Sequence, residues 1–262
     1  MLSGGVIASF VFGLVYGSFL NVVILRWDDW ASIINSRSRC PNCKTQLKWY
    51  DLVPVLSYAS LAGRCRYCQK PVSWQYPAVE ISTAVLVAAG FSLFFPVTGD
   101  LTMTVLAFSA FLLATGLAIS VFFHDLYEML VPDMMAYLLL FSAIVLGVFL
   151  YGWQSTLYGL LVAVIPISLL VYPTKGTWMG EGDVKIAAAL GAMVGFPNAI
   201  SFIALAFLIG GGYGILALLF KRVKMRTAVP FAPFLIIAAF MTFFYGAQII
   251  NWYVGITGYA SF

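Results

Sequence analysis

Eight apolar runs follow one another along the chain, separated by short polar segments. They cover residues 4–25, 78–96, 102–123, 134–151, 155–172, 184–196, 198–220 and 233–251. A helix that crosses a bilayer needs about 20 mostly apolar residues. The pattern therefore predicts about eight transmembrane helices, of which 184–196 is the shortest. No Lys or Arg precedes the first run, so we expect a retained helix rather than a cleaved signal peptide.

Composition supports the same fold class. Apolar residues make up 62% of the chain and charged residues 9%, against roughly 45–50% and about 25% in globular proteins. A soluble protein could not cover its surface with 14 basic and 10 acidic side chains while burying this much apolar area. Disordered proteins, coiled coils, secreted disulfide scaffolds and free nucleic-acid binders are therefore excluded. An all-α polytopic membrane protein, with the lipid bilayer as its partner, is predicted.

The basic residues predict how the chain is oriented. Eight of the fourteen lie in 26–75, two in 173–185 and four in 221–232, whereas 97–101, 152–154 and the tail from Asn251 contain none. Lys and Arg collect on the cytoplasmic side of membrane proteins. We therefore expect both termini outside and the basic segments, together with 124–133, in the cytoplasm. The predicted parts are a first helix (1–25), a cysteine-rich cytoplasmic loop (26–75) and a seven-helix core (76–262).

All four cysteines lie in the cytoplasmic loop, as the pairs Cys40/Cys43 and Cys65/Cys68. Each pair is a Cys-x-x-Cys knuckle, and 21 residues separate the two, one more than the range of about 15–20 for such zinc sites. Two knuckles supply the four thiolates of a tetrahedral structural zinc site. Two disulfides or four free thiols are the alternatives, and the reducing cytoplasm argues against disulfides.

Two aspartates at predicted helix ends are candidates for acid–base chemistry. Asp125 ends the third apolar helix and Asp183 begins the sixth, in Gly180-Glu-Gly182-Asp183. Ionisable groups at this depth face the bundle interior or a wet cavity. Two carboxylates that share one proton can activate water and protonate a carbonyl oxygen. The alternative for Asp183 is a helix N-cap. Gly180 and Gly182 would let an extended substrate approach the backbone closely.

Other polar residues near these segments have competing interpretations. Asp133 follows Pro132 and is better explained as the N-cap of the fourth helix. Glu80 is either a third acidic group near the site or a partner for loop arginines. Lys185 could hold substrate or balance the charge of the dyad, although an interfacial lysine extending to water is commoner.

An ordered series of motifs resembles one known family, the type IV prepilin peptidases of the GxGD class of intramembrane aspartic proteases. The motifs are Gly17-Ser-Phe-Leu-Asn21, the two cysteine knuckles, Trp49 to Tyr58, Gly63-Arg-Cys-Arg66, Tyr76-Pro-Ala-Val-Glu80, Asp125 to Asp133, Gly180 to Lys185 and Pro230-Phe-Ala-Pro-Phe234. One departure is His124, where an aliphatic residue usually precedes the aspartate. An imidazolium there would shift the pH optimum.

The resemblance implies that Asp125 and Asp183 are the catalytic pair. It implies cleavage of type IV prepilin or pseudopilin leaders after a glycine, at the cytoplasmic face of the bacterial inner membrane. Members with the cysteine loop also methylate the new N-terminus with S-adenosylmethionine, so both activities are expected, and the binding residues for that cofactor are not evident. A proton-coupled transporter is the alternative, but its charges would lie near the bilayer midplane. A zinc-ribbon adaptor would leave the acidic motifs unexplained.

Overall fold

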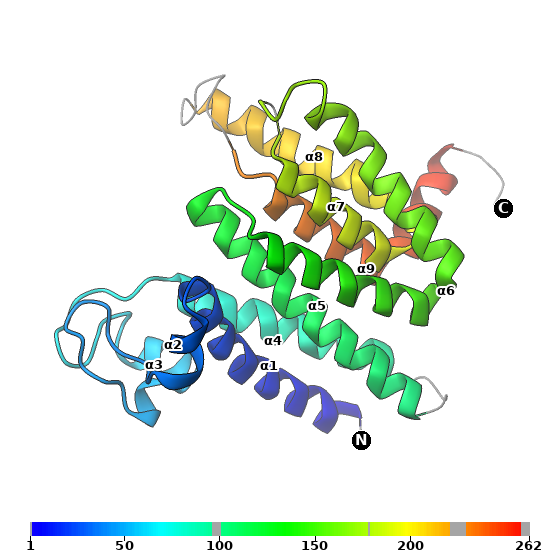
Figure 1. Cartoon of the computed structure of the whole chain (residues 1–262). Coiled ribbons are helices and arrows are strands. Elements are labelled where there is room, and N and C mark those ends of the chain that lie inside the picture. The colour runs from blue at the N-terminus through cyan, green and yellow to red at the C-terminus, as the bar shows by residue number, and fades with distance from the viewer. Residues whose placement is uncertain (1, 96–100, 178, 221–228, 258–262) are drawn as a thin grey trace. The chain divides into compact units, whose positions relative to one another are not determined.

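The computed structural model of the chain describes residues 2–95, 101–177, 179–220 and 229–257, which are mostly helical and contain no strand (Figure 1). The elements are α1 (Leu2–Leu25), α2 (Trp30–Asn35), η1 (Trp49–Asp51), α3 (Leu56–Ser60), α4 (Gln75–Phe94), α5 (Leu101–Glu128), α6 (Asp133–Val171), α7 (Glu181–Val194), α8 (Asn198–Leu219) and α9 (Ala232–Thr257). The prediction of an all-α polytopic membrane protein is confirmed.

Six helices are long and apolar enough to cross a membrane: α1, α4, α5, α6, α8 and α9. The difference from eight predicted helices has two causes. The 39-residue α6 contains two of the predicted runs, and its backbone leaves the helical region at Gly152, where φ is 80° and ψ is 163°. In Figure 1 the chain turns back on itself there. The other cause is α7, which has only 14 residues.

The described chain divides into two compact units, Met1–Phe108 and Ser109–Phe262, with the boundary inside α5. In the first unit α1 packs along α4. Two glycines allow the close approach: a Cβ at Gly13 would lie 2.6 Å from Ala84 Cα, and one at Gly17 would lie 2.7 Å from Glu80 Cα. Such small residues let helix backbones pack closely in membranes.

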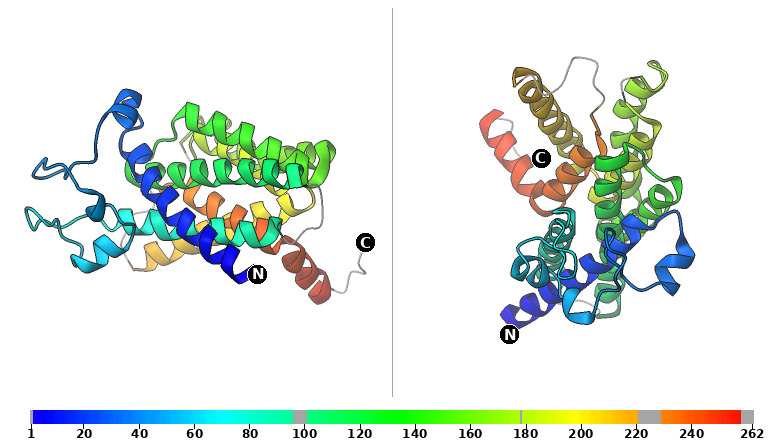
Figure 2. Two further views of the ribbon diagram at one scale, coloured as in Figure 1. Left: turned by 90° about the horizontal axis from the view of Figure 1, so that it is seen from below. Right: turned by 90° about the vertical axis from the view of Figure 1, so that its left-hand side faces the viewer.

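The segment between α1 and α4 carries α2, η1, α3 and both cysteine knuckles. It gathers at the end of these two helices where the chain leaves α1 and enters α4 (Figure 2). The side chain of Asp29 caps α2 by accepting a hydrogen bond from the Ser32 amide. Arg66 then joins the second knuckle to η1 through a 2.8 Å ion pair with Asp51. The elements are short because a segment of about 50 residues is too small to bury a large core.

In the second unit α7 is enclosed by α6, α8 and α9. Every residue from Ile186 to Val194 is buried, as expected for a helix that is apolar on all sides. Glycines again set the spacing, since a Cβ at Gly159 would lie 2.5 Å from the carbonyl oxygen of Gly191. This packing fixes the N-terminus of α7, where Asp183 lies. The basic residues of 221–226 lie outside the described residues, and the three-part domain division stays a prediction.

Candidate active site

Asp125 lies in the last turn of α5, and its side chain is buried. Its carboxylate accepts a hydrogen bond from the backbone N–H of Ala232, the first residue of α9. The Oδ2 atom has no hydrogen-bond partner within the described parts of the chain. A buried oxygen without a partner is costly unless a substrate or water completes it, so Asp125 has an acceptor available for chemistry.

Asp183 is the third residue of α7, and its side chain is also buried. It accepts a 3.2 Å hydrogen bond from the Gly180 amide, and Gly180, not Asp183, occupies the N-cap position. Burial, reinforced by the nearby charge of Asp125, raises the pKa of Asp183 to about 7. Asp125 and Asp183 therefore come close enough to influence each other's ionisation, as the sequence predicted for a pair.

The loop that follows α5 contacts the N-terminus of α7. Val131 lies against Gly182, where an added Cβ would come within 3.0 Å of the Val131 Cβ. From the end of α5, Nδ1 of the buried His124 lies 3.1 Å from the carbonyl oxygen of Leu130 in the same loop. The His124 Nε2 is 3.6 Å from Glu128. His124 thus connects the end of α5 to the loop. The residue that approaches Gly182 closely is Val131 of this chain.

Asp133 and Lys185 form an ion pair, and each lies a few residues after one of the two buried aspartates in the sequence. Lys185 Nζ lies 2.5 Å from Asp133 Oδ1 and 5.3 Å from the centre of the Tyr137 ring. The N-cap of α6 is Pro132, so Asp133 is the first helical residue rather than the cap. Lys185 accordingly has a defined protein partner instead of only extending toward water.

Glu80 belongs to the first unit, and its hydrogen-bond donors are a loop amide and a serine of α1 rather than a loop arginine. Its Oε2 accepts a 2.7 Å hydrogen bond from the backbone amide of Val55, and Ser18 also donates to it. Val55 has a φ of 59°, an uncommon conformation for a β-branched residue. Glu80 therefore holds a strained turn of the loop against α4.

The four cysteines converge in the first unit. Their Sγ atoms all lie within 4.8 Å of one another, and Cys40 Sγ is 3.9 Å from Cys68 Sγ. Zn–S bonds of about 2.3 Å in a tetrahedron place sulfur atoms roughly 3.8 Å apart. The four donors therefore fit a structural zinc ion with a small contraction and leave no ligand position open.

The two knuckles repeat the same backbone pattern 25 positions apart. Cys40 N–H donates to Thr45 O at 3.0 Å, and Cys65 N–H donates to Lys70 O at 2.9 Å. In each knuckle the residue after the second cysteine has a left-handed backbone, with φ of 58° at Lys44 and 57° at Gln69. Hydrogen bonds from Thr45 lower the pKa of Cys43 to about 6, whereas desolvation and hydrogen bonds with the other three thiols raise the pKa of Cys68 to about 11.

Comparison with known proteins supplies the family. The chain matches the bacterial peptidase A24 N-terminal domain over residues 11–94 and the type IV leader peptidase family over residues 110–215. It is 32% identical over 276 residues to a prepilin leader peptidase/N-methyltransferase of Aeromonas hydrophila, covering 94% of this chain and 92% of that protein. The chain belongs to the type IV leader peptidase family.

Two further relatives agree with this membership. Proteins of the same name from Bacillus subtilis and Legionella pneumophila are each 32% identical, with 94% of this chain covered and 96% and 93% of theirs. No solved structure matches the chain. The family resemblance predicted from the motifs is thus confirmed, as is an enzyme that combines peptidase and methyltransferase activities.

Sequence reasoning missed three polar contributions. The Ala232 amide was noted only as part of a motif, and its hydrogen bond to Asp125 depends on where α9 begins. Asn21 and Gln75 are buried at the ends of α1 and α4, each with a side-chain atom left without a partner. An amide in an otherwise apolar span was the available signal for Asn21.

Proposed function

We propose that this protein cleaves the leader of type IV prepilins or pseudopilins after a glycine, using Asp125 and Asp183 at the cytoplasmic face of the bacterial inner membrane. The observation that supports it most strongly is the burial of both carboxylates within each other's electrostatic influence. Membership of the type IV leader peptidase family supports the substrate class.

The two environments support different roles for the two carboxyl groups. Asp183, with a pKa raised to about 7, is the member that holds the shared proton. Asp125 and Asp183 each accept a hydrogen bond from one backbone amide, of Ala232 and Gly180 respectively, so the raised pKa of Asp183 is what assigns the two roles. The pair nonetheless titrates as a unit.

The chemistry then proceeds as general acid–base catalysis. Asp125 removes a proton from water, whose oxygen bonds to the carbonyl carbon of the leader glycine, while Asp183 protonates the carbonyl oxygen. The tetrahedral intermediate collapses when its C–N bond breaks and the leaving nitrogen takes the proton from Asp125. One hydroxyl on the former carbonyl carbon returns its proton to Asp183 as the C=O bond re-forms, so the dyad regains its starting protonation state. Exposed backbone at Gly180 suits the approach of an extended leader.

The same protein then methylates the amine that cleavage exposes. S-adenosylmethionine, when bound, supplies an electrophilic methyl group whose carbon bonds to the amine nitrogen as the C–S electron pair stays on sulfur. The new ammonium passes a proton to water. The four cysteines would hold zinc and so order the loop between α1 and α4, since a metal can supply much of the folding energy of such a small segment.

The decisive experiment incubates the purified protein in detergent with a prepilin. Asp125→Asn and Asp183→Asn should each lower cleavage by about 10²–10⁴-fold, the usual contribution of a positioned acid or base. Asp100→Asn and Glu181→Gln serve as matched controls that also remove one carboxylate and should cleave normally. Wild-type rates in either dyad variant would reject the assignment.

A further inference from the structure

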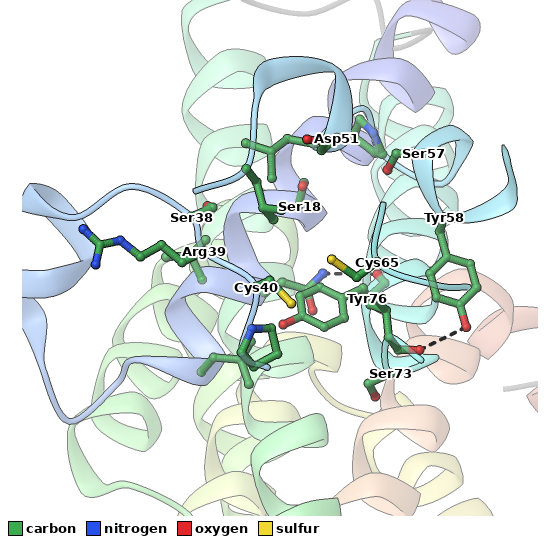
Figure 3. A pocket seen from close by; sticks show the side chains of 18 of the residues that line it. Ser18, Ser38, Arg39, Cys40, Asp51, Ser57, Tyr58, Cys65, Ser73 and Tyr76 are labelled. Atoms are coloured by element: carbon green, nitrogen blue, oxygen red, sulfur yellow. Dashed lines mark hydrogen bonds between the residues drawn. The ribbon is translucent and has the colours of Figure 1, made fainter. Parts of the chain in front are cut away.

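A cavity of about 930 Å³ lies in the first unit, where α1 and α4 meet the cysteine loop (Figure 3). This volume is within the range of roughly 300–1,000 Å³ that is usual for small-molecule sites. Its walls come from α1, from the loop around both knuckles and from the first turns of α4, including Cys40 and Cys65. None of its lining residues belongs to the unit that contains Asp125 and Asp183.

Two amide side chains in this cavity have unused hydrogen-bonding atoms. Asn21, 2% exposed, donates through Nδ2 to Tyr76 O at 3.1 Å and to Gly17 O at 3.4 Å. Those two carbonyl acceptors fix the orientation of the amide, so the free atom is the acceptor Oδ1. Gln75, 5% exposed, has an unpartnered Nε2.

Buried polar atoms are nearly always paired, because each unpaired one costs about 1–3 kcal/mol. Two residues that line one cavity, one with an unpartnered acceptor and one with an unpartnered donor, therefore indicate a ligand that presents both kinds of group. The buried carboxylate of Glu80 also lines the cavity. It accepts two protein hydrogen bonds and has about four acceptor positions in all, so it retains capacity for a cation.

We propose that this cavity, defined by Asn21, Gln75 and Glu80, is the binding site for S-adenosylmethionine. The inference rests on the methyltransferase part of the proposed function. The ligand's amino groups can donate hydrogen bonds to Asn21 Oδ1, and its ring nitrogens and carboxylate can accept one from Gln75 Nε2. Its positive charge is attracted by the carboxylate of Glu80. The ring of Tyr76, in the middle of the side chains drawn in Figure 3, offers an aromatic face to the adenine.

The cysteine loop then acquires a role in methyl transfer. Cys40 and Cys65 lie in the cavity wall and are two of the four candidate zinc donors. A metal that orders the knuckles therefore also orders part of the wall, although no atom of the metal needs to touch the ligand.

Binding of S-adenosylhomocysteine, which carries no transferable methyl group, tests the site by calorimetry on the full chain in detergent. Gln75→Leu should weaken binding by about threefold to tenfold, because it removes a single hydrogen bond at little cost to the protein. Ser57→Trp, which places an indole in the cavity wall, should abolish binding. Ser60→Trp, on the exposed side of the same helix α3, should bind normally.

Zinc content and size-exclusion profiles establish that each variant is folded, and mass spectrometry of the processed pilin reports methylation separately. Unaltered binding in both Gln75→Leu and Ser57→Trp, with wild-type protein that binds and methylates, would overturn the location while leaving the function intact. A wild-type protein that cleaves leaders but neither binds the probe nor methylates would overturn the methyltransferase function and the site together.

Discussion

Lys185, two residues after Asp183, reaches the carboxylate of Asp133, eight residues after Asp125, with 2.5 Å between Nζ and Oδ1. The pair thereby links the start of α7 to the start of α6. Val131 against Gly182 makes a second contact between the same two segments. The segments that carry the two buried aspartates are therefore joined by one polar and one apolar contact, both outside the dyad itself.

Breaking the ion pair should weaken leader cleavage without abolishing it. Asp133 is 69% exposed, and exposed pairs contribute about 0.2–1 kcal/mol, so Lys185→Met should reduce kcat/KM by roughly 1.4-fold to fivefold. Asp133→Asn should do the same, and the double variant should lose no more than either single variant. Lys175→Met, which removes an exposed lysine elsewhere, is the control; additive losses in the double variant would contradict the coupling.

The contact at Gly182 predicts a size-dependent effect with a specific rescue. Gly182→Ala brings a Cβ to 3.0 Å from the Val131 Cβ, so the loop must shift and cleavage should fall about tenfold, as small misplacements in active sites do. Val131→Ala should restore most of the rate when combined with Gly182→Ala.

At Gly180 an added Cβ meets only Asp183 Oδ2, at 3.8 Å. Gly180→Ala should therefore leave the thermal stability unchanged, and a lower melting temperature for Gly180→Ala than for Gly182→Ala would argue against this packing.

The ionisation of Asp183 predicts the alkaline limb of the pH profile. Because its pKa is raised to about 7, the folded protein holds this proton at acidic pH and loses it as the pH rises through 7. Leader cleavage should fall above pH 7, whereas the stability that this proton contributes is lost earlier, as the pH rises from the ordinary carboxyl pKa of 3.8 to about 7. Rates measured between pH 5 and 9 check this, with Glu181→Gln as the control.

The role of His124 can be read from the same profiles. Its Nδ1 lies beside the Leu130 carbonyl and its Nε2 faces Glu128, so a charge on the ring would act close to Asp125. His124→Leu should shift the pH optimum. An unchanged optimum would reject that hypothesis and leave His124 with the structural role of holding the loop.

Loss of the cysteines should separate the two activities. Replacing Cys40 and Cys43 together by Ser removes two of the four converging donors, so bound zinc should fall from one per chain toward zero. S-adenosylhomocysteine binding should be lost with it, and leader cleavage should fall less, because Asp125 and Asp183 lie in the other unit. Elemental analysis and calorimetry measure the first two effects; full zinc in the double variant would refute the four-cysteine site.

The sequence by itself determined the membrane class, the helices and the family. Charge was scarce enough that nearly every polar side chain within the apolar runs had a reason to be there, and hydrophobic length alone is sufficient to predict a spanning helix. The same reasoning correctly separated the runs 134–151 and 155–172, because the backbone leaves the helical region at Gly152 and divides α6 there. Cysteine spacing predicted the convergence of four thiols because a Cys-x-x-Cys knuckle is a local structure.

Tertiary structure decided which polar groups meet. The side chain of Asp183 accepts a hydrogen bond from the Gly180 amide, Lys185 pairs with Asp133, and Glu80 accepts a hydrogen bond from the amide of Val55. The partners of Lys185 and Glu80 are 52 and 25 residues away along the chain. Sequence periodicity reports only which face of a helix a residue occupies, whereas hydrogen bonds depend on how separate helices are placed within a few ångströms. The unpartnered amide atoms of Asn21 and Gln75 are also features that only the tertiary structure decides, because only packing can reveal that a buried polar atom has been left without a partner.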